Sequence, residues 1–228
     1  MKQILRALVL GSLLCVPLAH SEASQLAPKN VSPRRISLYE VPLVCPAAPQ
    51  IGCGSRSKPI LLALEQQPAV AEAWLNRAGT VMAVVWMAEA KRKDRTSALD
   101  AISKKEELQA RELTGVAKKK ALKDFLSGQE WHRGGDVDRL SEEEAGIIAA
   151  RLVRRIQAKV SVSEEKSKAL RVEFMNVFKQ RFTGAQANDQ TSAEEQLLNI
   201  LRGQLDEKDV ALLKKTLPRS IRPLPGEN

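Results

Sequence analysis

Two cysteines, Cys45 and Cys53, are the residues whose type and spacing best suit chemistry in this sequence. The segment between them contains two prolines and a glycine. Two thiolates held close together can bind a soft metal ion, and the same thiols can instead close a disulfide that stabilises the segment between them. A catalytic thiol would also need a neighbouring base, and the sequence assigns none. We therefore predict no catalytic residue and no enzyme, and keep metal binding and a disulfide as alternatives.

Cys53 stands close to the start of a predicted helix. Apolar residues recur at helical spacing from Lys58 onward and stop at Pro68, which predicts an amphipathic helix. The positive end of a helix and the charge of Arg56 both favour a thiolate. We therefore expect a lowered pKa for the Cys53 thiol.

The apolar patterns around that helix predict a βαββαβ order. The predicted strands and helices occupy, in turn, 36–41, 58–67, 70–75, 81–86, 95–102 and 108–113. A turn-rich segment at 76–79 makes the second and third strands a hairpin. Residues 42–54 contain three prolines and two glycines, and are predicted to be a loop that carries both cysteines.

Beyond residue 114 the pattern is helical throughout. Serine and glutamate recur at capping-box spacing before three apolar stripes, at Ser141…Glu144, Ser161…Glu164 and Ser192…Glu195. Each stripe needs a partner surface, so we expect these helices to pack as a small bundle. His132 is interpreted as a loop residue without a catalytic role. Asp136 and Asp138 are interpreted as turn and helix-start charges rather than as a calcium loop.

A fixed pattern of residues follows Cys53. It consists of Ile60, Leu64, Pro68-Ala69-Val70, Asn76, Val84 and Trp86. Over residues 36–87 this pattern resembles the heavy-metal-associated domain family, which includes periplasmic mercury-binding proteins and copper chaperones. The resemblance implies metal binding at the loop before the first helix. It carries this role to Cys53 more directly than to Cys45, because Arg56 stands where the family has its second thiol.

Residues 1–23 are predicted to be a cleavable signal peptide. Two basic residues precede an apolar run at 7–18, and small residues follow it. A membrane-spanning helix needs roughly 20 apolar residues, so the processed chain is expected to be soluble, with no transmembrane segment. We therefore expect a periplasmic or secreted protein whose two remaining cysteines meet an oxidising compartment.

These features predict an α+β protein in which a ferredoxin-like βαββαβ domain precedes a small all-α helical domain. The expected segments are the signal peptide at 1–23, a flexible leader at 24–34, a domain resembling heavy-metal-associated domains at 35–114, a helical domain at 115–217 and a polar tail at 218–228. The net charge of +9 makes the protein basic, but predicted export and an aromatic content of 4% argue against a nucleic-acid partner. The expected interaction is with a protein partner through the basic helical domain, and the oligomeric state is left open.

The sequence thus predicts a protein that binds or delivers a soft metal ion, Cu(I), Hg(II) or Zn(II), through Cys45 and Cys53. The alternative is a noncatalytic envelope interaction module in which Cys45 and Cys53 form a structural disulfide. No other cofactor is expected. The distance between the two sulfurs bears on this choice, because it is about 2 Å in a disulfide.

Overall fold

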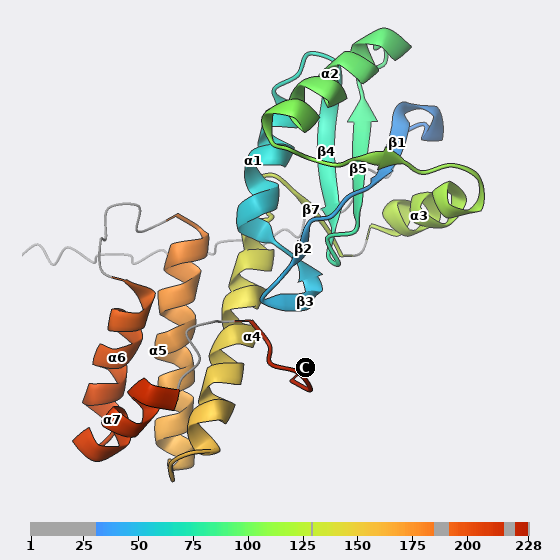
Figure 1. Cartoon of the computed structure of the whole chain (residues 1–228). Helices are drawn as coiled ribbons and strands as arrows, with labels where there is room; N and C mark the ends of the chain where they lie inside the picture. Colours follow the sequence, from blue (N-terminus) through green and yellow to red (C-terminus); the bar gives the residue numbers. More distant parts are fainter. Residues whose placement is uncertain (1–30, 129, 185–191, 217–221, 228) are drawn as a thin grey trace, which may run out of the picture.

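The computed structural model describes residues 31–128, 130–184, 192–216 and 222–227 (Figure 1). The predicted signal peptide and most of the predicted leader lie outside these residues. The described part has the α+β character that the sequence predicts, with a mainly antiparallel sheet and seven α-helices.

Five strands form the main sheet in the order β6-β1-β5-β4-β7, and every neighbouring pair is antiparallel. The strands are β1 (Ile36–Glu40), β4 (Val70–Asn76), β5 (Val81–Trp86), β6 (Arg111–Glu112) and β7 (Trp131–Arg133). The predicted first strand is confirmed as β1, and the predicted hairpin as β4 and β5. Asn76 closes the hairpin turn, because its Oδ1 accepts the backbone N–H groups of Thr80 and Val81, each at 2.9 Å.

Helices cover both faces of this sheet (Figure 1). They are α1 (Gly54–Glu65), α2 (Arg92–Lys105) and α3 (Gly115–Ser127). Leu61 of α1 and Ile102 of α2 are buried in the core on one face. Phe125 of α3 packs on the other face against Trp74 and Trp131, with ring centroids 5.9 and 4.9 Å away. Side chains alternate along a strand, so β1, β4 and β5 each contribute residues to both cores.

The segment 42–54, predicted to be a loop, instead contains a small antiparallel hairpin. Its strands are β2 (Val44–Cys45) and β3 (Ala48–Gly52). Pro46 lies in the turn between them, and Pro49 lies at an exposed position of a strand in a sheet of only two strands. Proline is tolerated at such edge and turn positions, so its presence did not exclude a hairpin. The prediction of a loop is wrong for this reason.

Four further helices pack around a third apolar core. They are α4 (Asp138–Gln157), α5 (Glu164–Phe182), α6 (Ala193–Gln204) and α7 (Glu207–Thr216). Ile148, Phe174 and Leu201 belong to this core, and at most 1% of each is exposed. Among the helices that the structure describes, none has the length and apolar character to cross a lipid bilayer.

Two details of this helical region differ from the sequence predictions. The region is not helical throughout, because it contains the strand β7, which pairs with β4. The sequence did not predict this strand, since three residues are too few to show a period-two pattern. Ser192 accepts the Glu195 backbone N–H as its capping spacing predicts, at 3.1 Å. In contrast, Ser163 rather than Ser161 caps α5, and Ser141 lies inside α4.

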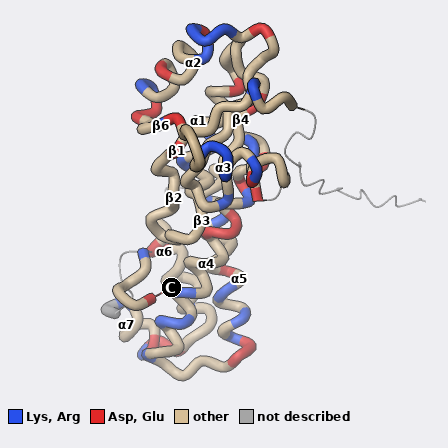
Figure 2. Tube along the Cα trace, turned by 90° about the vertical axis from the view of Figure 1, so that its right-hand side faces the viewer, with Lys and Arg blue, Asp and Glu red and all other residues tan. Residues whose placement is uncertain are grey.

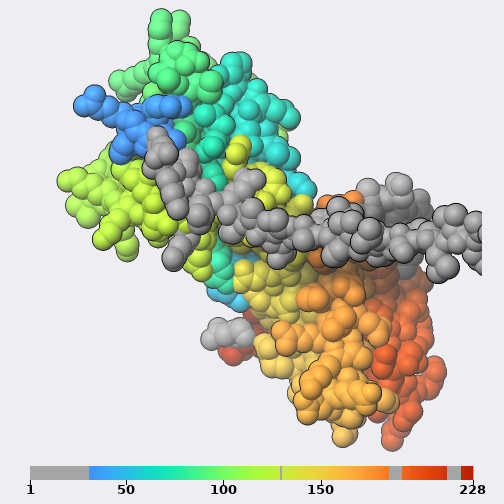
Figure 3. Space-filling model, turned by 180° about the vertical axis from the view of Figure 1, so that it is seen from behind, coloured from blue at the N-terminus to red at the C-terminus, as the bar shows by residue number. Residues whose placement is uncertain are grey.

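The β2–β3 hairpin joins the sheet to the helical bundle. Cys45, Ala48 and Ile51 are buried in the bundle core, although the hairpin follows β1 of the sheet directly in the chain. Gly54 approaches α4 so closely that a Cβ atom there would lie 2.8 Å from the Ser141 backbone nitrogen. Figures 1 and 3 show α4, in yellow, between the sheet and the orange-to-red helices.

Candidate metal-binding site

Three potential metal ligands lie together where the β2–β3 hairpin meets α4. The Sγ atoms of Cys45 and Cys53 and a carboxylate oxygen of Glu144 all lie within 4.8 Å of one another. Both cysteines are free thiols. The structure thus brings together the two residues that the sequence singled out, and adds a carboxylate that the sequence had placed only in a capping box.

Local hydrogen bonds fix the positions of both sulfurs. Cys45 ends β2, and the Ala47 backbone N–H donates to its Sγ at 3.3 Å. Cys53 is the N-cap residue of α1, and its own N–H donates to the Leu43 carbonyl at 2.8 Å. The Cys53 carbonyl accepts the Ser57 hydroxyl at 2.6 Å in the first turn of the helix. Cys45 is therefore held in the β2–β3 hairpin, and Cys53 is held at the start of α1.

The Cys53 thiol has the properties of a thiolate at neutral pH. Its pKa is lowered to about 5, chiefly by a hydrogen bond from the Cys45 thiol, with smaller contributions from Ser55 and Arg56. The lowering of the Cys53 pKa agrees with the sequence prediction. Its main cause is the hydrogen bond from Cys45 rather than the charge of Arg56. Cys53 is also the partly exposed member of the group, whereas Cys45 is buried.

The other two members of the group are held in their protonated forms more strongly than usual. The pKa of Cys45 is raised by its hydrogen bond to Cys53, by burial and by the nearby Glu144. Burial raises the pKa of the Glu144 carboxyl, whose residue is only 4% exposed. A cation that binds all three groups must therefore displace protons from this site.

These shifts predict that alkylation of Cys53 will depend on pH with a midpoint near its pKa of about 5. The thiolate is the reactive form, so the rate of modification by iodoacetamide should fall as pH falls through this value. Cys45 should remain unmodified until the protein unfolds, because it is buried and its pKa is raised. Mass spectrometry of a Cys15→Ser background checks both expectations.

The Cys45→Ala variant is the control for this pH dependence, because it removes the hydrogen bond that Cys53 accepts. The midpoint for Cys53 should then move to higher pH. A wild-type rate that keeps rising toward pH 8.5, as for an ordinary thiol, would contradict the assignment of a thiolate.

Two arginines stabilise the thiol site. Arg151 on α4 is 1% exposed, and its Nη1 donates to the Ala47 carbonyl in the hairpin turn at 2.7 Å. Arg56 on α1 lies near Cys53, and its charge helps to lower the pKa of that thiol. Burial lowers the pKa of Arg151, while the neighbouring Cys45 raises it. Arg151 thus links the hairpin to α4, and both arginines favour negative charge at the sulfurs.

His132 and the aspartates near it do not join this group. His132 lies in β7 rather than in a loop, and lines a separate pocket of about 180 Å³ with Arg77 and Glu143. Burial lowers the pKa of His132. Asp138 begins α4, as predicted for a helix-start charge, and its carboxylate pairs with the Lys58 ammonium at 2.5 Å.

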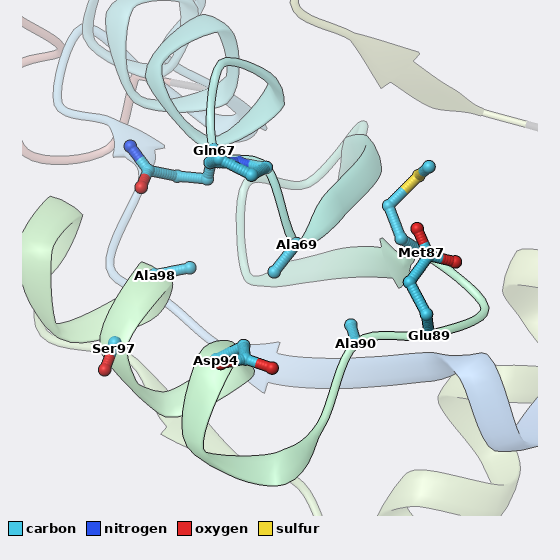
Figure 4. A pocket seen from close by; sticks show the side chains of 9 residues that line it. Gln67, Ala69, Met87, Glu89, Ala90, Asp94, Ser97 and Ala98 are labelled. Atoms are coloured by element: carbon cyan, nitrogen blue, oxygen red, sulfur yellow. The ribbon is translucent and has the colours of Figure 1, made fainter.

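Met87, which could act as an additional soft ligand, lies apart from the cysteines. It lines a pocket of about 360 Å³ between the α1–β4 connection and α2, together with Gln67 and Ala98 (Figure 4). Neither cysteine lines this pocket. Within the described residues, Cys45, Cys53 and Glu144 form the one group of three potential ligands at metal-binding distances.

The evidence for metal binding at this site comes from the types and positions of its residues. The pattern that resembles heavy-metal-associated domains includes Cys53, but Cys45 and Glu144 have no counterpart in it. No protein-family model, curated protein or solved structure matches the chain.

Proposed function

We propose that this is an exported, noncatalytic protein that binds or delivers a soft or borderline metal ion, Cu(I), Hg(II) or Zn(II), through Cys45 and Cys53. The observation that carries the proposal is the approach of both sulfurs and a buried carboxylate to within 4.8 Å of one another. Thiolates are the preferred protein ligands of these ions. One thiol is already poised as a thiolate, because the pKa of Cys53 is lowered to about 5.

The different burial of the two thiols supports a route for the ion. Cys53 is partly exposed and Cys45 is only 1% exposed. An incoming ion would first meet the Cys53 thiolate and then replace the proton of Cys45. Release to an acceptor would follow the reverse order, so delivery needs access to Cys53 alone.

The strand order supports a ferredoxin-like domain as part of this proposal. Along the chain the elements run β1-α1-β4-β5-α2-β6, and in the sheet β5 lies between β1 and β4. This is the arrangement of a split βαβ unit. The cysteine hairpin lies between β1 and α1, which is where the resemblance to heavy-metal-associated domains expects the metal loop.

The second candidate function is the interaction module with a Cys45–Cys53 disulfide. The two sulfurs are unbonded in the structure but lie within 4.8 Å of each other, and the oxidising compartment that the predicted signal peptide implies favours their oxidation. Basic residues would then serve a protein partner. Lys118, Lys119 and Lys120 form a basic stretch along α3, drawn in blue in Figure 2.

Metal titration with thiol counting separates the two candidates. In a Cys15→Ser background the remaining cysteines are Cys45 and Cys53, so thiol titration without reductant reports their state directly. After reduction we expect one Cu(I), Hg(II) or Zn(II) ion per chain. The Cys53→Ser variant should lose at least about 100-fold in affinity, more than the loss typical for a residue that merely supports a ligand.

The matched control is Met87→Leu, which removes a soft donor from a different pocket and should leave the affinity unchanged. Failure of the reduced protein to bind any of the three ions would contradict metal binding. The disulfide candidate would be supported if the protein has no free thiols before reduction and binds no ion after reduction.

A further inference from the structure

We propose that Glu144 is the third ligand of the thiol site and that it selects a divalent borderline ion, Zn(II), over Cu(I). This inference rests on the proposed function, because it requires an ion between Cys45 and Cys53. It adds the helical bundle as a source of a ligand, since Glu144 belongs to α4 and both cysteines belong to the hairpin region.

Glu144 is buried with the Cys45 thiol as a hydrogen-bond partner, but one of its carboxylate oxygens is unsatisfied. The residue is 4% exposed, and its Oε2 atom has no hydrogen-bond partner within the described part of the chain. Its neighbours on α4 differ in this respect: Glu143 pairs with Arg77, and Glu142 pairs with Lys179. Burial of an unpaired acceptor costs free energy, so such an atom needs a specific reason. A bound cation would supply the missing partner.

The carboxylate lies where it can share an ion with both sulfurs. Its oxygen is within 4.8 Å of each Sγ. Typical bonds from Zn(II) are about 2.3 Å to sulfur and about 2.0–2.2 Å to a carboxylate oxygen. Two ligands of one ion are therefore separated by no more than the sum of two such bonds, about 4.6 Å. Small side-chain rotations would bring the three groups onto one ion.

The mixture of ligands favours Zn(II) over Cu(I). Zinc binds both thiolate and carboxylate, and three protein ligands leave its fourth position open for exchange. Cu(I) is a soft ion that two thiolates suit without any oxygen ligand. Removal of the carboxylate should therefore weaken zinc binding selectively.

The balance of buried charge also favours Zn(II) over Cu(I). Two thiolates and a carboxylate carry three negative charges, and a divalent ion reduces this to one. The buried guanidinium of Arg151, which interacts favourably with Cys45, compensates the remaining charge. A monovalent ion would leave a further negative charge uncompensated in a site from which water is largely excluded, and this is costly.

Competition titrations of reduced protein in the Cys15→Ser background test the inference. The Glu144→Gln variant should bind Zn(II) at least about 100-fold more weakly, which exceeds the loss typical for a residue that only supports a ligand, while its affinity for Cu(I) stays within about twofold. Glu142→Gln is the matched control, because it removes an exposed carboxylate from the same helix and should change neither affinity. Unchanged Cu(I) binding by Glu144→Gln also establishes that the thiol site is still folded.

Two results would overturn the assignment of Glu144. One is Zn(II) binding by Glu144→Gln that equals that of the wild type, and the other is a parallel loss of both ions. If the wild-type protein binds none of Cu(I), Hg(II) and Zn(II), the proposed function itself fails. The inference about the third ligand fails on its own when the wild type binds zinc and Glu144→Gln gives either of these results, or when the wild type binds Cu(I) but not Zn(II).

Discussion

Replacement of Gly54 by valine is expected to lower the free energy of unfolding by about 3 kcal/mol and to weaken metal binding. Gly54 begins α1 next to Cys53, and its backbone packs directly on α4. A Cβ atom would lie 2.7 Å from the Val137 carbonyl oxygen and 2.8 Å from the Ser141 backbone nitrogen. Backbone atoms of a helix cannot rotate away, so α1 and α4 must separate.

Urea unfolding and zinc titration of Gly54→Val measure the two effects. Separation of α1 from α4 would move Cys53 away from Glu144, so stability and zinc affinity should fall together. Gly135→Val is the matched control, because a Cβ atom at Gly135 meets nothing within 4 Å. Equal stability of Gly54→Val and wild type would show that the junction between hairpin and α4 is looser than described here.

Replacement of Arg151 by alanine is expected to destabilise the protein by about 3 kcal/mol or more. The side chain is 1% exposed, and its guanidinium donates to the Ala47 carbonyl at 2.7 Å. Alanine would leave that buried carbonyl without this donor and would open a cavity beside Cys45. The hairpin turn would lose its charged anchor on α4.

Thermal and urea unfolding of Arg151→Ala test this expectation. Arg139→Ala is the control on the same helix, since Arg139 is exposed and surface substitutions usually change stability by no more than about 0.5 kcal/mol. Arg151→Lys should retain part of the stability, because lysine can still donate to the carbonyl but lacks the planar guanidinium. A loss no larger than that of Arg139→Ala would contradict a structural role for the buried arginine.

Much of the sheet domain could be predicted from local patterns. The apolar spacing before Pro68 predicted α1, and the alternation around the Asn76 turn predicted the β4–β5 hairpin. These signals are local, because period and turn chemistry are properties of neighbouring residues. The hairpin that carries Cys45 was missed because proline was taken as a sign of a loop, and a two-stranded sheet tolerates proline at its edges.

The third member of the site could not be paired with the cysteines from sequence alone. Glu144 lies far from Cys53 in the chain, and only the packing of α4 on the hairpin brings them together. A signal was nevertheless present. Ser141, Glu144 and Arg151 share the helical spacing of apolar Ile148, so polar residues interrupt the buried face of α4. Polar residues on a buried stripe need partners, and here the partner lies in the hairpin.

The central claim is that one ion is bound by Cys45, Cys53 and Glu144 together. Its most direct test is the zinc K-edge X-ray absorption spectrum of the reduced, Zn(II)-loaded protein in the Cys15→Ser background. The predicted spectrum contains two sulfur ligands at about 2.3 Å and oxygen ligands at about 2.0–2.2 Å. A shell of oxygen and nitrogen without sulfur would contradict the claim, as would four sulfur ligands, which would require a site formed between chains.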